Sequence, residues 1–256
     1  WCRAVAQSLT GLTAEGLART VGLQIGLGSR IRKSPFFEAL VRHGLTHVTV
    51  YNHMYMPGSF GDPDEEYRAL VERVSLWDVA AQRQVEVVGP DAFTLCQYVS
   101  ARDLRGMAVG RVRYAPMCDH DGILINDPMV LKLAEDRFWI SIADSDVLLW
   151  CQAVAVERGL DCRVFEPDVS PLAVQGPRAD DTMADLLGDW VGDVPFFGFV
   201  ETSHDGIPFV LCRSGWSGQG GFELFLQDGS RGLDLWDAVW AAGEKYGIHP
   251  GGPTPN

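Results

Sequence analysis

The sequence has 256 residues, of which 46% are hydrophobic and 21% charged, so it can bury a sizeable core as one large or two small globular domains. Its formal net charge is -13 and its pI is about 4.8, whereas binding to a nucleic-acid backbone needs clustered Lys and Arg. These values exclude a backbone-driven nucleic-acid binder and favour small-molecule chemistry.

The first part of the chain alternates helices and strands. Residues 1–24 have the spacing of a weakly amphipathic helix. The segment SPFFEALVRHG predicts a helix with proline in its first turn and Gly44 as its stop. A β-branched strand running into a loop is expected in THVTVYNHMYMP, residues 46–57. The acidic segment DPDEE favours a helix from Asp62 to Val74.

The rest of the chain predicts further strands and helices in a similar succession. Residues 74–100 predict two strands, a Gly-Pro break and a helix, and a meander of strands with turns at 119–122 and 135–136 follows. Further segments are expected as follows: a helix near 145–158, strands at 160–166 and 172–177, a helix at 178–187, a hairpin at 197–214 and the strand FELFL. This β-α-β-β-α-β succession of mostly antiparallel strands predicts an α+β fold rather than a Rossmann sheet.

Six cysteines occur at wide, uneven spacings without a CxxC pair, so we expect reduced core thiols and a cytoplasmic protein. No apolar run reaches the roughly 18 residues of a membrane span, and no charged-then-apolar leader opens the chain. The chain begins with Trp1 and stops at HPGGPTPN, which is loop-like and follows a helix. We therefore interpret the sequence as a fragment.

Several short motifs suggest ligand chemistry but are incomplete. The segment GWSGQGGFE matches neither GxxxxGK[ST] nor GxGxxG, and a strand rather than a helix follows it, which argues against a phosphate site. Gln219 breaks the GxSxG pattern of a hydrolase nucleophile. The run Asp119-His120-Asp121 is better explained as a solvated turn than as a metal site.

Two carboxylates and one histidine remain as candidates. Asp127 interrupts an apolar strand just before a proline, and Glu223 lies between apolar residues in GGFELFL. A bare buried carboxylate costs roughly several kcal/mol, so each is either paired within the core or faces a polar ligand. His53 lies among Tyr51, Asn52 and Tyr55 at a strand end, where ligand-binding loops often occur, although a surface loop explains it equally well.

From about residue 30 to its end the chain resembles the folate-dependent aminomethyltransferase superfamily, which has the fold of the glycine-cleavage T protein. The segments that carry the resemblance are WDV at 77–79, GILIND, LAVQGP and RSGWSGQGGFE. Within the superfamily the sequence resembles the dimethylsulfoniopropionate demethylases through VYNHMYMP, LWDVAAQRQVEVVGPDA and EPDVSPLAVQGP.

The resemblance implies a domain organisation. Residues 1–28 are an extension of unknown role, and residues 29–256 form a folate-binding domain of two α+β, ferredoxin-like lobes. The family continues into a C-terminal β-barrel, which we expect to be missing from this sequence.

The resemblance also implies site residues. The family's pterin-binding Glu matches Glu223, its central Asp near N5 of tetrahydrofolate matches Asp127, and its folate-packing Tyr matches Tyr114. Two departures are notable. Asn126 stands where relatives that cleave glycine carry Asp, and Phe225 stands where the demethylases are expected to carry Tyr.

The reaction implied is transfer of a methyl group from dimethylsulfoniopropionate to N5 of tetrahydrofolate, which gives 5-methyltetrahydrofolate and 3-methylthiopropionate. A sulfonium methyl is already activated, so neither metal nor cobalamin is expected. Aromatic rings would hold the sulfonium, with Trp216, Tyr51 and Phe60 as candidates and core packing as the alternative for each. His53 or Arg83 would bind the substrate carboxylate.

Other functions stay open at this stage. One is aminomethyl transfer as in the glycine cleavage system, or demethylation of another methyl donor. A second is a folate-binding regulatory protein without transferase activity. We expect a small-molecule substrate and neither nucleic-acid nor membrane partners, and a homodimer is compatible with the resemblance.

Overall fold

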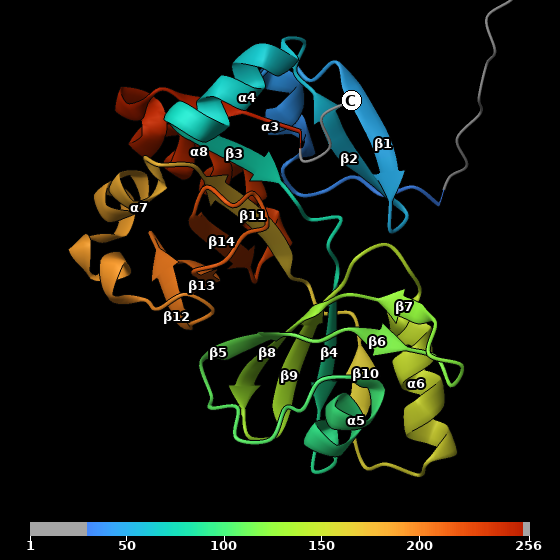
Figure 1. Cartoon of the computed structure of the whole chain (residues 1–256). Helices are drawn as coiled ribbons and strands as arrows, with labels where there is room; N and C mark the ends of the chain where they lie inside the picture. Colours follow the sequence, from blue (N-terminus) through green and yellow to red (C-terminus); the bar gives the residue numbers. More distant parts are fainter. Residues whose placement is uncertain (1–29, 253–256) are drawn as a thin grey trace, which may run out of the picture. The chain divides into compact units, whose positions relative to one another are not determined.

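The computed structural model describes residues 30–252, whose course is shown in Figure 1. Contacts divide the chain into two units, residues 1–31 and residues 32–256. The second unit holds every helix and strand that the structure describes, whereas the helix predicted in residues 1–24 lies outside the described residues. Within 30–252, no helix is both long enough and apolar enough to cross a membrane.

One sheet of the second unit is antiparallel and five-stranded, in the order β10-β4-β9-β8-β5. Its strands are β10 (Arg163–Phe165), β4 (Gln84–Val88), β9 (Arg137–Ser141), β8 (Met129–Ala134) and β5 (Arg111–Tyr114). Helices α5 (Ala92–Val99) and α6 (Val147–Glu157) contribute to a shared core with β4, β8 and β9. The order of β10, β4, β9 and β8, with α5 and α6 as connections, is that of a ferredoxin-like βαββαβ unit.

A second sheet has six strands in the order β12-β13-β14-β11-β3-β15. These strands are β12 (Phe199–His204), β13 (Ile207–Cys212), β14 (Gly221–Leu226), β11 (Ser170–Gln175), β3 (Val74–Asp78) and β15 (Ile248–Pro250). Helices α3 (Phe37–Arg42), α7 (Ala179–Leu187) and α8 (Gly232–Gly243) bury their apolar sides with alternate residues of these strands. Two connected lobes with mostly antiparallel sheets confirm the predicted α+β fold.

Smaller elements complete the unit. They are α4 (Pro63–Glu72), the pairs β1 (His47–Tyr51) with β2 (Met54–Ser59) and β6 (Met117–Cys118) with β7 (Leu124–Asn126), and the short helices η1 (Asp189–Asp193), η2 (Gly229–Arg231) and η3 (Glu244–Tyr246). The predicted start at Asp62 is confirmed, because its carboxylate accepts a hydrogen bond of 3.1 Å from the amide of Glu65. Gly44 follows α3 with φ +87°, as a helix stop requires.

Two segments differ from the prediction. The loop expected after the first strand is instead strand β2, which pairs with β1 across a tight turn at Asn52 and His53, both at positive φ. The first two residues of the loop expected at HPGG, His249 and Pro250, instead belong to strand β15, which pairs in parallel with β3. Both strands depend on partners that residue pattern alone did not identify.

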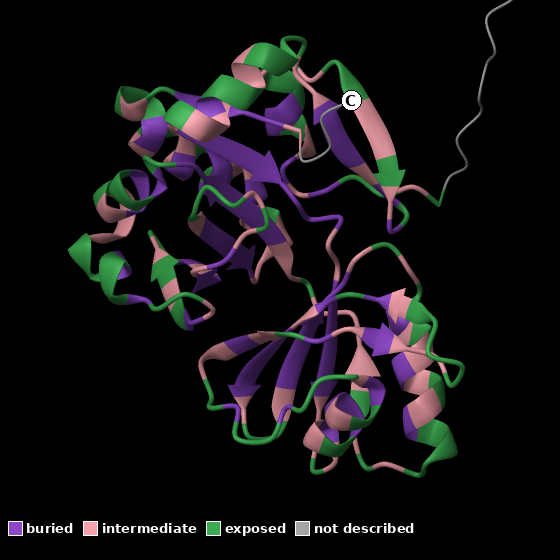
Figure 2. Ribbon diagram, in the orientation of Figure 1, coloured by how far each residue is buried: buried purple, intermediate pink, exposed green. Residues whose placement is uncertain are grey.

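The two larger sheets pack against each other through one apolar cluster. Val112, Leu131 and Trp139 lie on the five-stranded sheet, and Val210 and Phe225 on the six-stranded sheet. The rings of Trp139 and Phe225 have centroids 6.2 Å apart. Figure 2 shows the resulting burial along the central strands of both sheets.

Free cysteines are found where core thiols were predicted. Within the described part of the chain, Cys96, Cys151 and Cys212 are buried, and Cys118 and Cys162 are partly buried. Burial raises the pKa of the Cys151 thiol to about 12, so it stays protonated and unreactive at neutral pH.

Asp78, the acidic residue of WDV, is buried at the end of β3. Its carboxylate accepts hydrogen bonds from the Ser34 hydroxyl and from the backbone amide of Ala80, the latter at 3.0 Å. Burial outweighs these two bonds and raises the pKa of Asp78 from 3.8 to about 6. Asp78 therefore ties the segment before α3 to the start of the link between the two sheets.

The raised pKa of Asp78 predicts a pH-dependent stability. The native state keeps its proton to higher pH than the unfolded state, so the contribution of Asp78 to the free energy of unfolding is fully present below the unfolded pKa of 3.8 and is lost as pH rises through about 6. Asn keeps the shape without the charge, so Asp78→Asn should raise the free energy of unfolding at pH 7 by about 1 to 3 kcal/mol. Urea unfolding of both proteins from pH 4 to 7 measures this; parallel pH profiles would contradict it.

Candidate functional site

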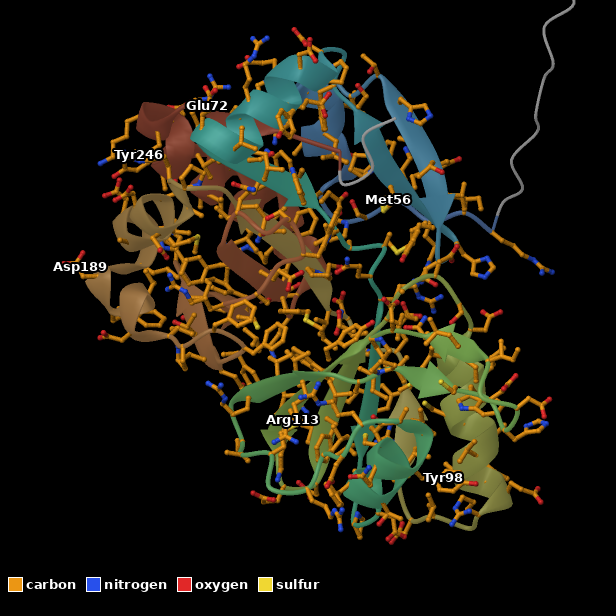
Figure 3. The ribbon with its side chains drawn as sticks, in the orientation of Figure 1. Met56, Glu72, Tyr98, Arg113, Asp189 and Tyr246 are labelled. Carbon is orange, nitrogen blue, oxygen red and sulfur yellow. The ribbon has the colours of Figure 1, made fainter. Side chains whose placement is uncertain are left out.

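A cavity of about 500 Å³ contains most of the predicted site residues. It is lined by Tyr51, Met56, Val79, Gln82, Tyr114, Asp127, Met129, Ser141, Ile142, Ala143, Phe197, Gly215, Trp216 and Glu223. Met56, labelled in Figure 3, comes from β2, and other lining residues come from both larger sheets or their connections. Among the described residues that line it none is basic and two, Asp127 and Glu223, are acidic, while most of the others are apolar.

Glu223 lies on the face of β14 that is turned to the other sheet. Its register partners are Ala173 on β11 and Cys212 on β13, and its side chain is buried. The carboxylate accepts one hydrogen bond, through Oε2, from the Ser214 hydroxyl. No other described residue donates to it, so Oε1 remains available to a ligand. Burial raises the pKa of Glu223, and the Ser214 hydrogen bond offsets part of that rise.

Asp127 follows β7 and is exposed to the cavity rather than buried in the core. Its Oδ2 accepts a hydrogen bond of 3.3 Å from the hydroxyl of Tyr114, the last residue of β5. Burial and the neighbouring Asp127 charge raise the pKa of Tyr114, which keeps its hydroxyl protonated as a donor. The structure thus brings Asp127, Tyr114 and Glu223 to one cavity.

Asn126, the residue before Asp127, forms hydrogen bonds within the fold. Its amide donates to the Ala143 carbonyl at 3.0 Å and to the Ser145 hydroxyl at 2.8 Å, and its oxygen accepts from the Ala143 amide. Asn52 makes a matching set of bonds to the same segment, donating to the carbonyl of Ala143 and accepting from the amide of Ser145. The two buried amides therefore fix residues 143–145, of which Ala143 lines the cavity.

Two aromatic candidates lie at the cavity and one does not. Tyr51 is partly buried in the wall, and Trp216 is 56% exposed at its rim, with its ring centroid 5.4 Å from that of Trp77. Trp216 also borders a smaller cavity of about 280 Å³ that Trp77 lines. Phe60 instead packs against the core of the six-stranded sheet.

His53 and Arg83 are also outside the cavity lining. His53 is exposed at the β1–β2 turn, with its Nε2 3.7 Å from Oδ1 of Asp146. Arg83 holds Glu166 in a two-point ion pair, with Nε 2.9 Å from Oε1. Its guanidinium is therefore already engaged, and the expectation that it serves the substrate carboxylate is not supported.

Sequence reasoning missed other residues of the wall. Met129 and Ser141 lie next to each other on β8 and β9, in register with Tyr114 of β5. Phe197 enters from the connection before β12, at a positive φ of 56°. Alternation along β8 and β9 could have placed Met129 and Ser141 on one face, but not opposite Glu223. Asp119 was correctly interpreted as a turn residue, because its carboxylate accepts from the amides of Asp121 and Ile123.

Comparison with known proteins gives consistent relationships. A family model described as the GCVT N-terminal domain matches residues 36–254. The chain is 44% identical over 225 residues to dimethylsulfoniopropionate demethylase DmdA of Ruegeria pomeroyi, which covers 88% of this chain and 62% of that protein. It is 30% identical over 235 residues to an aminomethyltransferase of Symbiobacterium thermophilum, with the same two coverages. The chain thus spans about three fifths of the length of these relatives.

A solved structure supports the fold. The glycine cleavage system aminomethyltransferase T from Bartonella henselae matches with a TM-score of 0.75 and 22% identity, over 87% of this chain and 60% of that one. At this identity the likeness concerns the fold alone.

The different surroundings of the neighbours Asn126 and Asp127 predict unequal effects of substitution on stability. Asn126→Asp removes two donors and places a carboxylate against the Ala143 carbonyl, so it should lower the free energy of unfolding by about 1 to 3 kcal/mol at pH 7. The loss should shrink at acidic pH, where a protonated Asp can donate again. The matched control Asp127→Asn, at an exposed position, should change it by less than about 0.5 kcal/mol. Equal effects in urea unfolding would contradict this account.

Proposed function

The chain belongs to the family of the glycine cleavage T protein N-terminal domain, and from this premise we propose that it is the folate-binding part of a tetrahydrofolate-dependent methyltransferase. The observation that carries the proposal is the convergence of Glu223, Asp127 and Tyr114 on one cavity. We propose dimethylsulfoniopropionate as the methyl donor, because the chain is 44% identical to a protein of that demethylase name.

The cavity has the chemistry to hold a pterin ring. An ionised carboxylate accepts two N–H donors well, and Glu223 offers an oxygen that no described residue uses. Met56, Met129 and Phe197 supply apolar surface for a flat ring. Glu223 would bind the amino and N–H groups of the pterin, while Tyr114 and Asp127 would lie toward its reactive edge.

Tetrahydrofolate would supply the nucleophilic nitrogen N5. In the proposed reaction the N5 lone pair forms the new bond to the methyl carbon, the sulfur–carbon bond breaks, and its electron pair leaves with a neutral thioether. The N5 proton is then released, so charge and atoms balance. Neither a metal nor cobalamin is part of this proposal.

The residues of the chain would act by position and charge. Asp127 would orient N5 and stabilise the positive charge that arises during methylation, with the Tyr114 hydroxyl fixing its carboxylate. The parts of the wall formed by Ala143 and Met129 would limit how far the two reactants can separate.

A cationic donor suits the aromatic rim. The exposed face of Trp216, with Trp77 beside it, offers a cation–π contact of roughly 0.5 to 2 kcal/mol, and Tyr51 adds a second aromatic wall. The lack of a basic residue among the described lining residues also favours a cation. We keep His53 as the proposed partner of the substrate carboxylate, because it lies two residues after Tyr51, in the β1–β2 turn.

Aminomethyl transfer is a second candidate function, favoured by the 30% identity to an aminomethyltransferase. A folate-binding protein without turnover is a third, and it predicts folate binding that Asp127→Asn does not weaken.

We further propose that the protein is cytoplasmic. Size measurement by light scattering would test whether it is a homodimer.

The proposal is tested by supplying the protein that carries this chain with tetrahydrofolate and dimethylsulfoniopropionate, without added metal or cobalamin. We expect both 5-methyltetrahydrofolate and 3-methylthiopropionate, and Asp127→Asn should lower kcat by at least about tenfold. Parallel assays with an aminomethylated lipoyl carrier and with methylated amines separate the alternative donors. Folate binding without either product would overturn the transferase proposal.

A second prediction concerns Glu223 alone. Glu223→Gln keeps the size but replaces a charged acceptor, so tetrahydrofolate affinity at pH 7 should fall about tenfold or more. Isothermal titration calorimetry measures this, with Glu72→Gln on the exposed end of α4, labelled in Figure 3, as the matched control. Equal affinities of the two variants would mean that Glu223 does not bind the pterin.

A further inference from the structure

We propose that Ser214, held in place by Gln175 beneath the glycine-rich turn, is the positioning residue for the Glu223 carboxylate. This inference rests on the proposed folate site and adds to it the groups that prepare Glu223. Ser214 would fix which carboxylate oxygen faces the cavity and would favour the ionised form that a pterin needs.

The contact between Ser214 and Glu223 is shielded from solvent. Ser214 and Glu223 are each 2% exposed, and the serine hydroxyl donates to Oε2 of the carboxylate. With Oε2 occupied, the rotation of the carboxyl group is set and Oε1 is left toward the cavity. Since Ser214 is the sole donor that the described residues supply, its removal leaves the buried charge without a partner.

Gln175 fixes Ser214 in turn. The Gln175 side chain is 1% exposed at the end of β11, and its Nε2 donates to the Ser214 carbonyl at 3.1 Å. Its Oε1 accepts from the hydroxyl of Ser217 at 2.7 Å. One amide therefore clamps both the residue before Gly215 and the residue after Trp216, which also fixes the segment that carries Trp216.

The glycines of the turn make room for this clamp. A Cβ at Gly215 would lie 2.1 Å from Oε1 of Gln175, and a Cβ at Gly221 would lie 2.1 Å from the Val174 carbonyl. Both residues also have positive φ, +145° and +138°. Glycine at positions 215 and 221 is thus explained by close approach to Gln175 and β11, without a phosphate ligand.

The electrostatic setting makes a single donor important. The titratable groups around Glu223 are Cys212 on β13 and, in the lining of the same cavity, Tyr51, Tyr114 and Asp127. None of these is a cation, and burial raises the pKa values of Cys212 and Tyr51, so both stay neutral. Burial raises the pKa of Glu223, and among residues 30–252 Ser214 is the one group that lowers it.

A pterin that donates to Glu223 needs the carboxylate, so folate affinity is lost as pH falls through the pKa of Glu223. Ser214→Ala removes the lowering contribution and moves that loss to higher pH. If Ser214 served packing alone, Ser214→Ala would change the free energy of unfolding without moving the pH at which Glu223 titrates.

The first measurement needs no folate. Carboxyl infrared difference spectra, assigned with Glu223→Gln, give the titration of Glu223 in the protein. We expect Ser214→Ala to raise its midpoint by at least about one pH unit, and the conservative Ser214→Thr to restore the wild-type midpoint. Ser217→Ala keeps the Ser214 hydroxyl and should move the Glu223 midpoint far less. An unmoved midpoint in Ser214→Ala would overturn the inference.

The second measurement is folate affinity against pH. Ser214→Ala should bind tetrahydrofolate about tenfold more weakly at pH 7 and approach wild type at higher pH. If Ser214→Ala does not fold, Gln175→Met tests the same clamp and should also raise the Glu223 midpoint; no shift there would count against the inference. If the wild type binds no folate, the proposed function fails, whereas the carboxyl titration still decides the role of Ser214.

Discussion

The packing of the two sheets through Trp139 and Phe225 is the constraint on which the rest of this structure depends. At this contact large apolar side chains from both sheets fill the space between them. Two residues before Phe225 on the same face of β14, Glu223 faces a cavity instead. Because side chains on one face of a strand alternate with those on the other, the strand that anchors the packing also delivers the carboxylate to the cavity.

Buried carboxylates of the chain differ in how many donors they receive. Glu86, on the inter-sheet face of β4, accepts from the Arg137 guanidinium and from the Trp139 indole. Asp78 accepts from a hydroxyl and an amide. Glu223 accepts from one hydroxyl and borders open space. A buried carboxylate that lacks hydrogen-bond donors costs free energy. Glu223, rather than Glu86 or Asp78, is therefore the candidate for ligand binding.

The two residues expected to depart from the family pattern, Phe225 and Asn126, have separate structural roles. Phe225 is fully buried against Trp139, so the absence of a hydroxyl there serves the apolar contact between the sheets. Asn126 uses its amide as both donor and acceptor to hold residues 143–145, which an aspartate could not do in the same way. Neither residue is needed to explain how Asp127 and Tyr114 reach the cavity.

Residue order alone determined the α+β class, most helices and strands, and the candidates Glu223, Asp127 and Tyr114, because periodicity, capping residues and family motifs are local signals. Only the tertiary structure decided which candidates meet. It placed Tyr51 and Trp216 at the cavity, left His53 at an exposed turn, and engaged Arg83 with Glu166. It also decided that β2 and β15 are strands, and that Gln175 clamps Ser214 from 39 positions away. Such contacts arise from strand pairing and sheet packing between distant segments, and no pattern within a single segment encodes them.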